Sequence, residues 1–451
     1  MRRVLAVALV GALGASVRGE DAPLTLAEAV AMAARQNPAL LAARERAAAE
    51  EARAAAVADS RWPRLTLASS LSRTDNPSGV FSHKLDAGAF TQDDFAIDRL
   101  NDPGSISHLT TWAGLELPLD VFGKTSDAAQ GQAAVGRAAR ALAREAALDA
   151  RLRVVEAYHS AALARRAVEV SERAFDGARS REAETEARVQ QGMLLEAELL
   201  RARTRRRRRE AELADRRGEM ATAAATLSRR LGAPPESTYV PSEAPGAPAP
   251  LVGDEGSWTA RGLAGRPLIE VARERMEASR RRSRLEGRAL LPDLVAYGRV
   301  QDDRNDASHG AQSYAVGLDV RWSAIDPGRG RREAAAAADL RAAEQDLRAL
   351  TDQVRLEVAS AYRHAQAARE HWSAAAGGSA EGREALRVVQ ERRRAGLATL
   401  TDELETEAAA LAAELDESRA ATQAAIADAA LARSAGVDAA SQVSGTPRGE
   451  Q

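Results

Sequence analysis

Residues 394–405 read RAGLATLTDELE, and a related stretch lies 204 positions earlier, around Gly192. Gly192 follows Tyr158 by 34 residues, and Gly396 follows Tyr362 by the same number. Each glycine stands between two long helical patterns, so we interpret Gly192 and Gly396 as the tips of two helical hairpins. A duplication of this size predicts two structurally equivalent halves that share one core.

The match extends upstream of the hairpins. Pro38 and Pro63 are 25 residues apart, and so are Pro267 and Pro292 in the second copy. We predict that each repeat contains a helix, a β-hairpin and a long helical hairpin, as the patterns described below indicate. The predicted organisation has five parts: a signal peptide (1–19), a first repeat (20–232), a proline-rich linker (233–256), a second repeat (257–436) and a disordered tail (437–451).

The composition favours long helices over compact globular domains. The chain has 451 residues, of which 45% are hydrophobic and 3% aromatic, with alanine, arginine, glutamate and leucine in excess. A net charge of −2 argues against nucleic acid as a partner. Because cysteine is absent, the chain has no disulfide, no thiolate metal site and no lipidated N-terminal cysteine.

The N-terminus resembles a secretory signal peptide. Two arginines, Arg2 and Arg3, precede an apolar run from Val4 to about Ala15. This run is too short to cross a bilayer as a helix, and no later window is long enough. The alternative is an N-terminal anchor. We expect an exported protein without a membrane-spanning helix.

Four segments alternate between apolar and polar residues and are predicted as strands of two β-hairpins: 64–72, 109–119, 294–301 and 313–322. The long polar segment 73–108 joins the first two. This alternation is typical of a transmembrane β-barrel, and it is equally compatible with a half-buried strand of a soluble sheet. In a barrel, the candidates for aromatic residues at the membrane interface are Trp112, Tyr297, Tyr314 and Trp322.

Two proline-free helical patterns, 123–191 and 328–394, follow the hairpins. At 1.5 Å per residue each could reach roughly 100 Å. Four strands are too few to close a barrel, because bacterial outer-membrane barrels have at least eight. Three copies would supply twelve strands, and a duplicated protomer suits a closed ring.

The chain resembles the TolC-like outer-membrane efflux proteins over nearly its whole mature length. The similar stretches are LTLAEAV at 24–30 with Asn37-Pro38, Trp62-Pro63, LELPLDVFG at 115–123, WSAIDPG at 322–328 and the tip at 394–404. The resemblance implies a mainly α-helical homotrimer whose 12-stranded β-barrel lies in outer-membrane lipid and continues as a helical tunnel through the periplasm. It also implies a periplasmic adaptor and an inner-membrane pump as partners.

The same resemblance implies an acidic gate at Asp402 and Glu405. Their three-residue spacing places both carboxylates on one helical face, and a threefold axis would collect six of them. Such a ring attracts cations. The alternative is a pair of ordinary solvated helix charges. The first repeat differs, with Glu198 at the position of Asp402 but Arg201 at that of Glu405.

Other motifs carry less weight. The run Arg205 to Arg209 favours a solvated or intersubunit charged face over a nucleic-acid site, because Glu210 follows it. His364 and His371 are seven residues apart, too far for a zinc-binding pair with i, i+4 spacing. We find no nucleophile elbow, phosphate loop or catalytic triad pattern, so we expect neither an enzyme nor a cofactor or metal.

Two other functions remain compatible with the sequence. A periplasmic coiled-coil adaptor or scaffold would never enter the membrane, although adaptors carry one helical hairpin and this chain has two. A secretion duct for proteins would use the same fold as an efflux duct.

Overall fold

A computed structural model describes residues 22–234, 237–306 and 310–437. The signal peptide predicted at 1–19 and all but the first residue of the predicted tail lie outside these residues. The chain forms two compact units. The helical unit contains residues up to 44, 143–267 and from 351 onward, and the sheet unit contains 45–142 and 268–350. Both repeats contribute to both units.

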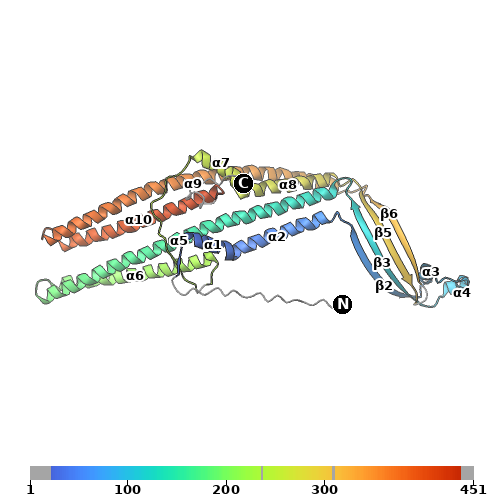
Figure 1. Ribbon diagram of the computed structural model, residues 1–451, viewed down its shortest axis with the longest axis horizontal. Coiled ribbons are helices and arrows are strands. Elements are labelled where there is room, and N and C mark those ends of the chain that lie inside the picture. The colour runs from blue at the N-terminus through green and yellow to red at the C-terminus, as the bar shows by residue number, and fades with distance from the viewer. Residues whose placement is uncertain (1–21, 235–236, 307–309, 438–451) are drawn as a thin grey trace. The chain divides into compact units, whose positions relative to one another are not determined.

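The helical unit is built from long helices and two short strands (Figure 1). Its elements are β1 (Ala22–Leu24), α1 (Leu26–Gln36), the start of α2 (Pro38–Asp59), most of α5 (Lys124–Gln190), α6 (Glu196–Leu231), β4 (Tyr239–Pro241), α7 (Glu255–Gly265), most of α9 (Arg329–Arg394) and α10 (Leu400–Ser434). The two long helical patterns predicted from the sequence are confirmed as α5 and α9.

Four helices of this unit lie side by side in the order α9, α10, α5, α6 (Figure 1). Between α9 and α10, Gly382 lies close to Ala410. Ion pairs join the other neighbours: Arg173 with Glu414 between α5 and α10, and Arg206 with Glu182 between α6 and α5. The two hairpins are therefore neighbours, and α9 and α6 form the outer flanks of the row.

Equivalent hydrogen bonds recur in the two repeats. The Tyr158 hydroxyl donates to the carbonyl of Leu24 (2.8 Å), and the Tyr362 hydroxyl donates to that of Gly253 (3.4 Å). Both acceptors directly precede the N-cap of a short helix, α1 or α7. The repeats thus share contacts as well as sequence spacing.

The end of each helical hairpin is closed by a glycine. Gly232 and Gly436 have φ angles of 76° and 68°, which favour glycine. A Cβ atom at either position would lie 2.6 Å from a backbone oxygen, that of Gln36 or Gly265. A side chain at these glycines would therefore be both strained and in steric conflict with the neighbouring helix end.

A buried cluster of charges surrounds Arg266, whose side chain is fully buried. Its guanidinium lies 2.8 Å from the carboxylate of Glu145 on α5 and 3.3 Å from Glu357 on α9. Arg433 of α10 joins the same cluster through Glu145 (3.2 Å) and Asp149 (2.7 Å). Each buried charge has an opposite partner, so the cluster links α5, α9 and α10.

The predicted linker contains a strand that the sequence did not reveal. β4 pairs in parallel with β1, with Leu24 opposite Pro241. The pair lies beside an apolar core of helical residues that includes Ala29, Val154, Tyr158 and Leu227. Strands of three residues are too short to show alternation, which explains the omission.

The sheet unit contains a four-stranded antiparallel sheet in the order β2-β3-β5-β6. Its elements are the rest of α2, β2 (Arg64–Thr74), α3 (Pro77–Asp86), η1 (Gln92–Phe95), α4 (Ile97–Asn101), β3 (Ile106–Leu119), the start of α5, α8 (Pro267–Gly287), β5 (Asp293–Arg304), β6 (Gly310–Arg321) and the start of α9. The four predicted strands are confirmed. All four strands extend beyond the predicted limits, because ladder pairing continues there.

One face of the sheet is apolar and exposed. Its members are Leu65, Leu67, Leu71, Leu115, Val300, Tyr314, Val316, Leu318 and Val320. The opposite face carries Thr66, Ser70, Glu116, Arg299, Gln301, Ser313 and Asp319. This alternation matches a strand with lipid on one side and polar surroundings on the other.

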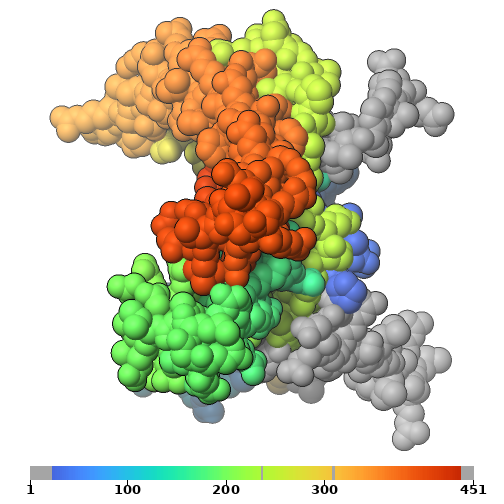
Figure 2. Space-filling view, turned by 90° about the vertical axis from the view of Figure 1, so that its left-hand side faces the viewer, coloured from blue at the N-terminus to red at the C-terminus, as the bar shows by residue number. Residues whose placement is uncertain are grey.

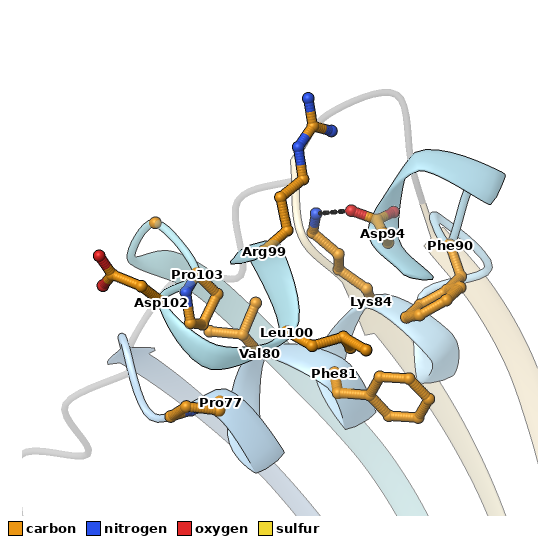
Figure 3. A pocket seen from close by; sticks show the side chains of 11 residues that line it. Pro77, Val80, Phe81, Lys84, Phe90, Asp94, Arg99, Leu100, Asp102 and Pro103 are labelled. Atoms are coloured by element: carbon orange, nitrogen blue, oxygen red, sulfur yellow. Dashed lines mark hydrogen bonds and ion pairs between the residues drawn. The ribbon is translucent and has the colours of Figure 1, made fainter. Parts of the chain in front are cut away.

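The segment between β2 and β3, expected to be a polar loop, folds instead into a small cap formed by α3, η1 and α4. Phe90 packs edge-on against Phe81 and Phe95, with ring centroids 4.6 and 5.1 Å apart. Lys84 donates to Asp94 over 2.6 Å, beside a cavity of about 260 Å³ (Figure 3). The sequence analysis missed these short helices because the segment is mostly polar.

The cap is joined to the strand ends by two stacked histidines. The rings of His83 and His108 are nearly parallel, with centroids 4.0 Å apart. His108 contacts Asp303 (3.1 Å) and Asn305 (2.8 Å), and the Asn305 amide donates to the carbonyl of His83 (3.0 Å). Burial, followed by the neighbouring His108, lowers the pKa of His83.

We predict that Arg266→Met lowers the free energy of unfolding by about 3–5 kcal/mol, because it leaves the Glu145 carboxylate buried without its main partner. Thermal unfolding of the detergent-purified protein measures the loss. The control is Arg387→Met, which removes solvent-exposed ion pairs on α9 and should leave the unfolding temperature nearly unchanged. Equal losses in both variants would contradict a special role for the cluster.

The cap should loosen in acid. Hydrogen bonds from Lys84 and Thr91 lower the pKa of Asp94 from 3.8 to about 2. A depressed carboxylate pKa stabilises the fold above about pH 4, and this stabilisation is lost as the pH falls toward 2. We expect Asp94→Asn to speed hydrogen exchange in residues 77–101 at neutral pH. Exchange that stays at the rate of the control, Asp98→Asn on α4, would argue against this role of Asp94.

Candidate functional site

Each of the two glycines proposed as hairpin tips stands between two consecutive long helices. Gly192 and Gly396 follow α5 and α9 with φ angles of 73° and 75°. Their backbone N–H groups donate to the carbonyls of Val189 and Arg393, both over 2.9 Å. The left-handed conformation ends each long helix and lets the chain return as α6 or α10.

The side chain of Asp402 takes part in the N-terminal cap of helix α10, whose N-cap residue is Thr399. Its carboxylate accepts hydrogen bonds from the backbone N–H (2.9 Å) and the hydroxyl (2.7 Å) of Thr399, and its own N–H donates to that hydroxyl (3.1 Å). This reciprocal pair is a capping box. The hydrogen bonds from Thr399 lower the pKa of Asp402, so the carboxylate is ionised at neutral pH and held in place.

Asp402 and Glu405 are both exposed near the start of α10. Glu405 has no ion pair within the described part of the chain. The adjacent Glu403 differs, because it is buried and forms an ion pair with Arg393, which also lies 3.6 Å from Glu184. Of the acidic residues Asp402, Glu403 and Glu405 in α10, the first and the last are thus exposed to solvent.

Glu403 was missed by the sequence analysis, although a signal for it existed. Glu403 occupies the position of Leu199 in the first repeat, and both residues are 8% exposed. A charge at a repeat position that is otherwise apolar indicates a buried ion pair. The cations at the end of α9, Arg392 to Arg394, supply its partner.

The first hairpin tip has a different chemistry. Glu198 is paired with Arg201 over 2.8 Å, so the position of Asp402 carries a neutralised charge here. The N-cap of α6 is Leu195, which makes no side-chain capping hydrogen bond. Met193 and Leu195 are strongly exposed. The two tips share a backbone shape and differ in charge.

The strand register shows that the predicted interface aromatics do not all lie on the same face of the sheet. Tyr297 pairs with Glu116 and Gly317, so it lies on the polar face of the sheet. Trp112 lies on the same face, where the guanidinium of Arg299 stands 4.4 Å from its ring centroid. Both rings therefore point away from the apolar face.

Tyr314 lies on the apolar face and is 81% exposed. Trp322 follows β6, is exposed, and donates its indole N–H to the carbonyl of Leu290 (2.8 Å). We retain the membrane-interface role as a proposal for these two residues.

Other sequence features are placed as follows. In the arginine run on α6, Arg206 and Arg209 form ion pairs with glutamates. Across the residues that the structure describes, no group of three or more His, Asp or Glu side chains is arranged to hold a metal ion. Over the same residues, no helix combines the length and apolarity needed to cross a membrane.

Comparison with known proteins gives a family match over both repeats. The model of the outer membrane efflux protein family matches residues 29–233 and 258–437. No curated protein is similar enough to count as a match. This family match favours a channel over the periplasmic adaptor or scaffold that the sequence also allowed.

Several solved structures have the same fold. The outer-membrane channel OprN is 22% identical with a TM-score of 0.74, covering 92% of this chain and 90% of its own. VceC from Vibrio cholerae is 20% identical (TM-score 0.72, 91% and 96% covered), and the CmeC channel of Campylobacter jejuni is 16% identical (TM-score 0.76, 93% and 88% covered). The chain therefore belongs to the outer membrane efflux protein family and is an outer-membrane efflux channel that extends into the periplasm.

Proposed function

We propose that three copies of the chain assemble into a passive duct that carries substrates from an inner-membrane pump and a periplasmic adaptor to the cell exterior. The supporting observation is the sheet itself. Within the residues that the structure describes, its outer strands β2 and β6 each have one edge without a strand partner, and one face is apolar and exposed. Open edges and four strands are incompatible with a barrel of one copy, whereas three copies supply twelve strands.

The gate of this duct is the second hairpin tip, with Asp402 and Glu405 as its charged groups. Both carboxylates are exposed, and Glu403 between them is neutralised by Arg393. A threefold axis near the tip would bring six carboxylates into one ring. Carboxylate rings favour cations, so the closed duct should conduct cations better than anions.

The first tip contributes scaffold rather than charge to the gate. At the equivalent positions, Glu198 is neutralised by Arg201. The ring therefore has threefold acidic symmetry, although the backbone around it is repeated six times.

We predict that the double substitution Asp402→Asn and Glu405→Gln raises the conductance of the purified channel in a planar bilayer and reduces its cation preference several-fold, because six charges leave the constriction. The control is Asp416→Asn, which removes an exposed acid about four turns farther along α10. Unchanged ion selectivity in the double variant would refute the acidic gate. A protein that forms no conducting trimers at all would refute the duct.

Capping and charge can be separated at Asp402. Thr399→Val removes the hydroxyl of the capping box but keeps both carboxylates, so we expect faster hydrogen exchange at the start of α10, at a cost of about 1 kcal/mol, with ion selectivity preserved. Lost ion selectivity in Thr399→Val would show that the order of the tip, not its charge, sets the ion preference.

Conversely, Leu195→Thr should slow hydrogen exchange at the start of α6, because Glu198 then completes a capping box.

A further inference from the structure

The two repeats of one chain meet through α5 and α10. Arg173 of α5 lies 2.8 Å from Glu414 of α10, and Arg181 of α5 forms an ion pair with Glu407. In this part of the contact, which lies nearer the hairpin tips than the Arg433 pairs, the bases are on α5 and the acids on α10. Gly177 stands midway between the two arginines, where a Cβ atom would touch the Glu407 carboxylate at 3.4 Å.

Among the described residues of the helical unit, no further long helix lies beyond α9 or α6 in this row. The row runs α9, α10, α5, α6 (Figure 1), and the view onto the hairpin tips shows the second hairpin beside the first (Figure 2). By the internal duplication, α9 is equivalent to α5 and α6 is equivalent to α10. A head-to-tail contact between copies would therefore pack α9 of one copy against α6 of the next.

The period of the duplication gives the register of this outer contact. Gly177 of α5 corresponds to Glu381 of α9. Leu411, which lies between Glu407 and Glu414 on α10, corresponds to Arg207 of α6. Where the inner contact has a glycine on α5 and a leucine on α10, the equivalent positions of the outer contact carry an acid on α9 and a base on α6.

Both residues are available for such a contact. Glu381 and Arg207 are exposed, and neither forms an ion pair within the described residues. One turn before Glu381, Gly377 and Gly378 have no atom within 4 Å of an added Cβ. This open, side-chain-free surface leaves room for a neighbouring helix.

We propose that Glu381 of one copy binds Arg207 of the next and that this pair sets the order of the repeats around the ring. The inference rests on the proposed trimer and adds the surface that builds it. The α5–α10 contact inside the chain and the α9–α6 contact between copies have opposite arrangements of charge. This difference allows the Glu381–Arg207 pair to select the correct neighbour. Wrong pairings would bring like charges together: Glu381 would meet the acids of α10, and Arg207 would meet the arginines of α5.

The next positions along the outer contact add no attraction. Arg166, which also binds Glu414, corresponds to Glu370, and Glu414 corresponds to Glu210. Two acids stand at these equivalent places. The complementary charge of the outer contact is therefore concentrated at Glu381 and Arg207.

Charge reversal tests the pair. We expect Glu381→Arg and Arg207→Glu each to reduce the fraction of detergent-resistant trimer about tenfold, because three contacts per ring are lost together, and the double variant to restore it. The matched control is Arg205→Glu. Its equivalent on α10, Ala409, is exposed, so Arg205 should lie outside the contact between copies. A double variant no better than either single variant would overturn the proposal.

Cross-linking gives a second, independent readout in a chain without cysteine. The variant with Glu381→Cys and Arg207→Cys, treated with a short bis-maleimide, should yield covalent dimers and trimers, whereas Glu381→Cys with Arg205→Cys should yield far fewer. Trimers without cross-links at the first pair would refute this contact and leave the duct standing. Monomers in every variant and in the wild type would refute the duct itself.

Discussion

The order of the long helices depends on charged contacts between alanine-rich faces. The buried residues of α10 are mostly alanines, which bury little area each. Between α5 and α10, the ion pairs nearer the tips include Arg173 with Glu414 and Arg181 with Glu407. Partly exposed ion pairs contribute little stability, so we interpret them as selecting which helices become neighbours. Stability at the opposite end of the hairpins comes from the buried cluster around Arg266.

The sequence predicted those elements that are long enough for a periodic pattern of apolar and polar residues to be seen. The bounds of α5 and α9 followed from proline-free helical patterns closed by Gly192 and Gly396, and the strands followed from alternation. The cap and the β1-β4 pair were missed, because their elements are too short for periodicity to appear. Their stability comes from tertiary contacts such as Lys84 with Asp94, which pair residues that no local pattern connects.

At the candidate gate, spacing predicted which carboxylates share a face but not what each one binds. Asp402 and Glu405 are exposed, while Asp402 also forms the capping box of its helix with the N-cap Thr399. Glu403 looked equivalent to its neighbours until the structure showed it buried against Arg393. For the strand aromatics, the register was decisive, because a residue's face depends on its pairing partner.

The positions where the two repeats differ are those to which we assign function. Glycine caps and tyrosine hydrogen bonds are common to both repeats and build the scaffold. Asp402 replaces a neutralised Glu198, and Glu381 replaces Gly177. An exposed charge on a duplicated scaffold is not required for the fold of its own repeat, since the other repeat folds without it. Such a charge is free to act on what lies outside the chain, which is an ion in the proposed gate and a second copy at the proposed outer contact.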